Sequence, residues 1–126
     1  MDEISLQVPT PILDSLPEDG DNARMDMQRA VEGWEIQLNR AVEAAADDDE
    51  AVGAIVDALE RFGNRWEQYD DFVVELRAWG QSPIYAMAWR DLQSSLIQQV
   101  YDHEGLADRL DRERHARILD DGIRPK

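Results

Sequence analysis

Apolar residues recur at alternating intervals of three and four through the central part of the chain. This spacing places them on one face of a helix and predicts three long helices, over residues 23–46, 50–80 and 83–104. The positions at this spacing are Met27, Val31, Trp34, Leu38, Ala41 and Ala45 in the first span, and Val52, Ile55, Leu59, Phe62, Trp66, Tyr69, Val73 and Leu76 in the second. In the third span they are Tyr85, Trp89, Leu92, Leu96 and the polar Gln99 and His103, with Val100 beside them.

Heptad spacing of this kind is typical of helices that cross at about 20° with interlocking side chains. We therefore predict an all-α protein: an antiparallel bundle of three long helices plus a shorter polar C-terminal helix. The middle helix is expected either to break at Gly63–Asn64 or to project beyond its neighbours, and the unbroken periodicity favours one continuous helix. The pattern leaves open whether the apolar faces meet within one chain or between chains. The side chains expected to be buried are Trp34, Leu38, Leu59, Phe62, Trp66, Leu92 and Leu96.

Residues 1–22 are predicted to form an extended arm outside the bundle of residues 23–104. Pro9, Pro11 and Pro17 disfavour a helix and an uninterrupted strand ladder in this segment. A disordered linker is usually poor in large apolar residues, whereas this arm contains six. We expect the arm to dock on another subunit, or at least on the bundle, through Ile4, Leu6, Val8, Ile12, Leu13 and Leu16.

Residues 105–126 are predicted to form a polar helix over 106–120, followed by a short tail that contains Ile123. Leu106 and Leu110 begin an apolar stripe that only Ile118 and Leu119 continue. The remaining positions are mostly charged and allow several favourable pairs at i,i+4 spacing. We expect a solvated helix with a narrow contact edge.

The strong excess of acidic residues says more about the protein's function than any motif does. The chain has 28 acidic residues against 13 basic ones, a formal net charge of −15, and its single lysine is Lys126. This composition resembles that of proteins from salt-accumulating halophilic archaea and their viruses; a GC-rich genome is the alternative explanation. Such a surface repels phosphate and anionic lipid, so we expect loosely bound cations but neither nucleic-acid nor membrane binding.

The sequence predicts no signal peptide, and it excludes disulfides and other cysteine chemistry. The first residues have neither the basic region nor the apolar run of a signal peptide, and the chain contains no cysteine. We expect a cytoplasmic or virion-associated protein.

No group of residues has the spacing of a known catalytic or metal-binding motif. Asp47–Glu50 is a contiguous acidic run whose side chains point in different directions, unlike a calcium loop, and it suits the start of a helix. His103 and His115 lack partners at the spacing of a zinc or di-iron site, and Ser94 and Ser95 lie mid-helix. We predict no catalysis, no metal site and no cofactor.

Trp79 lies outside the apolar faces of the predicted helices, whereas Trp34, Trp66 and Trp89 lie on them. Because tryptophan is enriched among the residues that dominate binding energy in interfaces, Trp79 and the turn at 78–85 are a candidate interface. With the six apolar residues of the arm and Ile123, Trp79 completes the set of expected interface residues.

These features favour a non-enzymatic structural or interaction subunit of a larger assembly, built from copies of itself and neighbouring subunits. In architecture the chain resembles the connector and adaptor proteins at the head–tail junction of tailed viruses, which are small and helical and have termini that reach onto neighbours. An acidic mimic of nucleic acid that inhibits a DNA-binding protein is the main alternative. A small enzyme or ligand-binding bundle is the third possibility.

Overall fold

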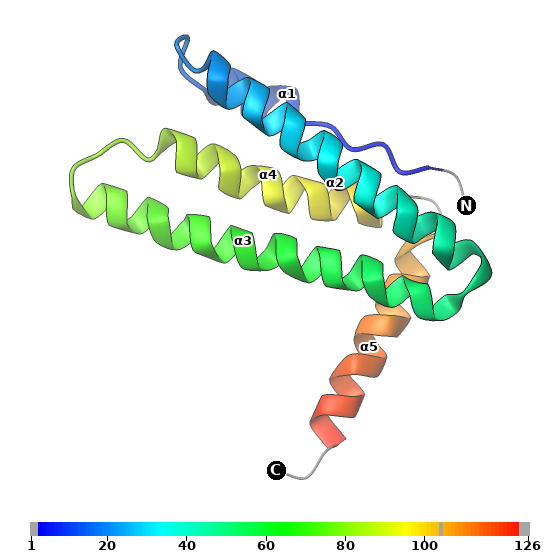
Figure 1. Cartoon of the computed structure of the whole chain (residues 1–126). Helices are drawn as coiled ribbons and strands as arrows, with labels where there is room; N and C mark the ends of the chain where they lie inside the picture. The colour runs from blue at the N-terminus through cyan, green and yellow to red at the C-terminus, as the bar shows by residue number, and fades with distance from the viewer. Residues whose placement is uncertain (1–2, 104, 124–126) are drawn as a thin grey trace.

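The computed structural model describes residues 3–103 and 105–123, and within them every regular element is a helix. Three long helices, α2, α3 and α4, run antiparallel, and α5 projects from one end of them (Figure 1). The predicted fold class is confirmed. The elements are α1 (Thr10–Ser15), α2 (Asp21–Asp47), the 3₁₀ turn η1 (Asp49–Ala51), α3 (Val52–Ala78), α4 (Ile84–Tyr101) and α5 (Ala107–Ile123).

The core lies where the apolar faces of the long helices meet, and the most extensive packing is between α3 and α4. Five of the seven side chains predicted to be buried are buried, and Trp34 and Trp66 are half-buried. Trp34 packs its ring edge-to-face against Phe62, with 5.4 Å between ring centroids. The Arg65 guanidinium lies 5.0 Å from the centroid of the Trp34 ring, so a cation shields an indole that apolar packing alone leaves partly open.

Helix α3 continues without a break through Gly63 and Asn64, as the periodicity predicted. The expected lengths were less accurate, because α2 and α3 both contain 27 residues. The acidic run is the reason: η1 occupies its second half, so α3 begins at Val52 rather than near residue 50. Helix α3 is therefore longer than α4, which has 18 residues, but not longer than α2.

The N-terminal arm is not extended throughout, which corrects the prediction for residues 10–15. Helix α1 begins directly after Pro9, and the Pro9 carbonyl accepts hydrogen bonds from Ile12 N (3.0 Å) and Leu13 N (3.2 Å). Pro11 lies in the first turn, where the missing N–H would have no partner within the helix. Proline at this position therefore starts a helix instead of preventing one.

Residues 3–9, before α1, are extended, and side chains of two long helices hold their backbone. Asn39 of α2 pairs with both backbone groups of Ile4: Ile4 N donates to Asn39 Oδ1 (2.7 Å) and Asn39 Nδ2 donates to Ile4 O (3.0 Å). Gln99 of α4 pairs in the same way with Gln7, at 2.9 Å in both directions. Leu6 N donates to Glu35 Oε2 of α2 at 2.7 Å. These side chains take the place of a neighbouring strand, and the arm thereby links α2 to α4.

The arm also contributes to the chain's own core. Ile4 is only 2 % exposed, and Leu6 and Leu16 are likewise buried, while Val8 and Ile12 pack against the core at its edge. The predicted docking of the arm on the bundle is confirmed. Its predicted contact with another subunit stays a prediction.

Gln93 of α4 is fully buried, and neither its Oε1 nor its Nε2 has a hydrogen-bond partner. An unsatisfied buried amide costs about 1–3 kcal/mol of stability. We therefore expect Gln93→Leu, which is close in volume, to raise the free energy of unfolding by about 1–3 kcal/mol. Urea unfolding followed by circular dichroism in molar KCl measures this change.

Gln99→Leu is the matched control, because it makes the same chemical change on the same helix. It removes both amide contacts to Gln7, so we expect it to lower the free energy of unfolding by about 1–3 kcal/mol. Effects of the same sign in both variants would contradict the assignment of Gln93 as unsatisfied.

Ile4→Ala tests whether the arm belongs to the folded core. Removing a fully buried isoleucine costs about 2–5 kcal/mol, so the urea midpoint should fall accordingly. Ser5→Ala at the exposed neighbouring position is the control and should change the midpoint little. An unchanged midpoint for Ile4→Ala would mean that the arm is not docked in solution.

Candidate interaction surfaces

The residues considered for chemistry do not converge in the structure. Among the described residues, no three His, Cys, Asp or Glu side chains are grouped so that they could hold a metal ion. His103 is half-buried with an unpartnered Nε2, and His115 is exposed on α5. Ser95 Oγ accepts a hydrogen bond from Gln99 Nε2 at 3.1 Å, which supports the side chain that holds the arm.

The acidic run turns the chain between α2 and α3. Asp48 Oδ1 accepts a hydrogen bond from Glu50 N at 2.9 Å and so stabilises the start of η1. Helix α3 itself has Ala51 at its N-cap and no acidic residue in its first turn, so the run shapes the turn before α3 and does not start the helix as the sequence had suggested. None of the described helices has a segment long and apolar enough to cross a membrane.

The turn between α3 and α4 exposes a group of large apolar side chains, which we call the apolar tip: Trp79, Ile84 and Tyr85. Trp79 is 67 % exposed, and Ile84 and Tyr85 are each about two-fifths exposed. Gly80 shapes the turn with a φ of 71°, and Gln81 N closes it on Leu76 O at 2.9 Å. The turn joins the end of α3 to the first residues of α4, where Ile84 and Tyr85 lie.

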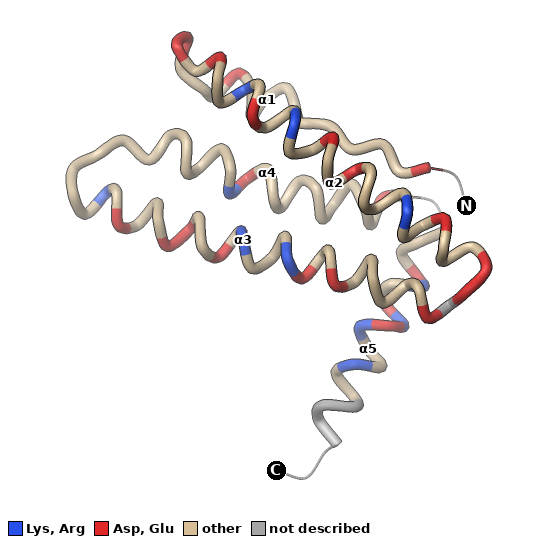
Figure 2. Tube along the Cα trace, in the orientation of Figure 1, with Lys and Arg blue, Asp and Glu red and all other residues tan. Residues whose placement is uncertain are grey.

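Charge is missing from this same region. Residues 78–89 contain no charged side chain, although a third of the chain is charged, and Figure 2 shows the uncharged stretch running from the end of α3 into α4. The exposed Trp79 ring has no charged side chain beside it within this segment. Trp79, the residue favoured from sequence, therefore lies exposed within an uncharged segment.

A second feature is the junction at which α5 meets the three long helices. Arg117 is at its centre: its Nη1 contacts Asp57 Oδ1 at 2.8 Å and Glu60 Oε1 at 3.2 Å, and its Nε contacts Glu113 Oε1 at 3.2 Å. Arg117 Nη2 also donates to Gly53 O at 3.1 Å, a close approach that the missing Cβ of Gly53 allows. The hydrogen bond to Asp57 raises the pKa of Arg117 above its usual value.

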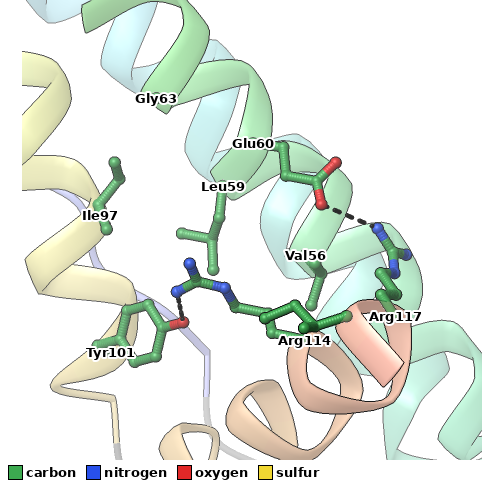
Figure 3. A pocket seen from close by; sticks show the side chains of 9 residues that line it. Val56, Leu59, Glu60, Gly63, Ile97, Tyr101, Arg114 and Arg117 are labelled. Carbon is green, nitrogen blue, oxygen red and sulfur yellow. Dashed lines mark hydrogen bonds and ion pairs between the residues drawn. The ribbon is translucent and has the colours of Figure 1, made fainter. Parts of the chain in front are cut away.

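Arg109 and Arg114 complete the junction. Arg109 Nη2 donates to Ala45 O (2.8 Å) near the C-terminal end of α2, where a carbonyl lacks a partner within the helix. Arg114 Nη1 donates to the Tyr101 hydroxyl at 2.5 Å, and this contact raises the pKa of Arg114. Figure 3 shows Arg114, Tyr101 and Arg117 around a cavity of about 350 Å³, which is also lined by the apolar side chains of Val56, Leu59 and Ile97. The arginines thus fix α5 to the bundle.

A third feature is a hollow of about 570 Å³ on the outer face of α2, which we call the α2 hollow. Its rim includes the carboxylates of Glu3, Glu35 and Glu43 and the guanidinium of Arg40. Ile36 lies in it and is 55 % exposed. The lining therefore combines three carboxylates, one guanidinium and an exposed isoleucine.

The interface residues expected from sequence do not form one surface in the structure. Trp79 is exposed at the apolar tip, whereas the arm residues face the bundle, with Leu13 half-buried. Ile4, Leu6 and Leu16 could reach another subunit only if the arm left its own bundle. Ile123 is the last residue of α5, and its side chain lies outside the described residues. Sequence reasoning missed Ile36. The one signal in the sequence for its exposure is that it does not share the spacing of the apolar face of α2.

One family model, described as a family of unknown function (DUF7971), matches the chain over residues 1–126. The chain therefore belongs to this family. Searches of curated proteins and of solved structures each give no match.

Replacing Arg117 tests the junction. Arg117→Gln removes the contacts to Asp57 and Glu60, so we expect amide hydrogen exchange to speed up in α5 and to stay unchanged in α3 and α4. The effect should be larger in dilute buffer than in molar salt, because these partly exposed pairs are screened.

Arg112→Gln on the same helix is the control. Arg112 is exposed, and its Nε donates only to the Asp108 carbonyl, at 3.4 Å. Exchange in α5 should therefore stay near the wild-type rate. Equal acceleration in the two variants would refute the role given to Arg117.

Proposed function

We propose that this member of the family of unknown function is a non-enzymatic structural subunit of a larger assembly, built mainly from copies of itself. A virion component of the connector or adaptor type, working in concentrated salt in a halophilic archaeon or its virus, is the form of this proposal that the composition favours. Such a subunit is cytoplasmic or virion-associated. Its partners are other proteins, with loosely bound cations around its carboxylates.

The observation that carries the proposal is the apolar tip. In a chain with a net charge of −15, most approaches between two copies bring carboxylates together. The segment 78–89 avoids this repulsion, and it presents Trp79, Ile84 and Tyr85 to solvent. Covering these side chains removes apolar surface from water at about 25 cal/mol per Å², and concentrated salt screens the repulsion that opposes this contact.

The test is the native mass of the full chain by light scattering, measured from dilute buffer to molar KCl. We expect assembly to increase with salt, and we expect Trp79→Ser to weaken it by about 10- to 100-fold in dissociation constant, as for a central interface tryptophan. Helical circular dichroism should be unchanged, since Trp79 is exposed.

Val74→Ser is the matched control, because Val74 is exposed to a similar degree on α3 but lies outside the uncharged segment. It should assemble like the wild type. A wild-type chain that stays monomeric at every salt concentration would refute the proposed function. An acidic nucleic-acid mimic behaves in the opposite way, because its binding to a basic target weakens as salt rises.

A further inference from the structure

Helix α3 has a second set of residues at heptad spacing, on its outer side. Away from the face that packs in the core, six residues up to and including the C-cap follow one another at intervals of four and three, so they lie along one side of the helix. We call this side the outer stripe, and its members are Arg61, Arg65, Gln68, Phe72, Glu75 and Trp79. Arg65 is half-buried and the other five are exposed. This spacing is typical of a helix that packs against another helix, yet most of the stripe faces solvent.

The two halves of the outer stripe differ in charge. The first half contains Arg61 and Arg65. The second half contains Glu75 between the aromatic side chains of Phe72, which is 46 % exposed, and Trp79. Figure 2 shows basic positions near the middle of α3 and acidic positions between these and its C-terminal end. Among the described residues, no carboxylate pairs with either arginine and no cation pairs with Glu75. The stripe therefore carries unpaired charge of both signs.

The basic half of the stripe borders a groove of about 110 Å³ between α2 and α3. Trp34 and the small side chains of Ala41, Ala54 and Ala58 are part of its lining. No carboxylate lines this groove, whereas the junction cavity and the α2 hollow both contain carboxylates. Guanidinium groups attract aromatic rings as well as carboxylates. The groove therefore suits the kind of side chain that the second half of the stripe contains.

Other carboxylates of α3 do not cancel the basic half of the stripe. Asp57 and Glu60 both contact Arg117, at 2.8 and 3.2 Å, which partly neutralises them. Glu67 and Asp71 lie about 80–120° around the helix from the centre of the stripe. The stripe itself thus presents two guanidinium groups at one end and one carboxylate at the other.

We propose that the outer stripes of two copies pack against each other antiparallel, as a two-fold dimer. This inference rests on the proposed function, and it names the surface that covers Trp79 of the apolar tip. In the interlocking register of antiparallel helices, three pairs of positions face each other. Each pair joins one copy to the other: Glu75 with Arg65, Trp79 with Arg61, and Phe72 with Gln68. Because the two-fold axis repeats every contact, one dimer contains two of each.

The opposed halves explain how this surface can bind a copy of itself in a chain with a net charge of −15. Antiparallel packing brings the basic half of one stripe onto the acidic half of the other, whereas parallel packing would bring arginine onto arginine. Trp79 then meets a guanidinium and the small side chains of the groove. The rest of both surfaces stays acidic, so the dimer should form more readily as salt screens that repulsion.

The test reverses one charge at a time. Glu75→Arg creates like charges opposite Arg65, and Arg65→Glu creates like charges opposite Glu75. Each should raise the dissociation constant of the dimer by about tenfold or more, because each dimer then contains two such contacts. Sedimentation equilibrium measures this constant at the lowest KCl concentration at which the wild type assembles. Glu67→Arg is the matched control: it makes the same change in net charge at an exposed position outside the stripe, and it should not weaken the dimer.

Combining the two reversals should restore binding. The double variant Arg65→Glu, Glu75→Arg has opposite charges at both contacts and the net charge of the wild type, so it should bind nearly as tightly. An equimolar mixture of the two single variants should also bind more tightly than either alone. Failure of both to recover would overturn the pairing while leaving the proposed function intact, provided that the wild type assembles. A wild type that never assembles would overturn both.

Introduced thiols report the orientation of the helices, since the chain contains no cysteine of its own. Antiparallel packing places Gln68 opposite Phe72, whereas parallel packing places each residue opposite itself. A mixture of Gln68→Cys and Phe72→Cys should therefore form disulfide-linked dimers faster under mild oxidation than either variant alone. Val74→Cys, at an exposed site off the stripe, measures linking by random collision. Linking of either variant to itself as fast as in the mixture would overturn the antiparallel pairing.

Discussion

The structure depends on how two amide side chains hold an extended segment. Asn39 on α2 and Gln99 on α4 each donate to and accept from one residue of the arm, as a neighbouring strand would. The extended backbone thereby gains partners without a sheet, and its apolar side chains, Ile4 and Leu6, turn inward. The three long helices alone would leave the apolar surface under the arm exposed, so the arm is a structural element of the bundle.

The remaining surface is arranged around repulsion between carboxylates. Arginines lie where they join elements: Arg117 and Arg109 attach α5, and Arg90 joins α4 to α3 through Asp70 at 2.9 Å. Each such contact replaces repulsion with attraction at a seam between elements. The apolar tip achieves a similar result by having no charge at all.

The three long helices could be predicted from sequence because the cause is local: apolar residues repeat at helical spacing, and any helix formed from them must bury that face. Helix α1 could not be predicted, since the same prolines that prevent a helix in its interior are accommodated in its first turn. The amide contacts of the arm join residues 35 and 92 positions apart, and no local pattern marks Asn39 or Gln99 as their partners. Trp79 could be identified because it breaks the periodicity. The α2 hollow could not, because it forms where the arm passes α2, and the sequence does not show that path.

The position of Gln99 has a consequence for how the chain folds during synthesis. Gln7 leaves the ribosome 92 residues before its partner, which at about 5–20 residues per second leaves the arm waiting roughly 5–20 s. During that interval Ile4, Leu6 and Leu16 have no complete groove to occupy. Contacts of such sequence separation slow folding, and an apolar segment exposed meanwhile is open to other chains made nearby.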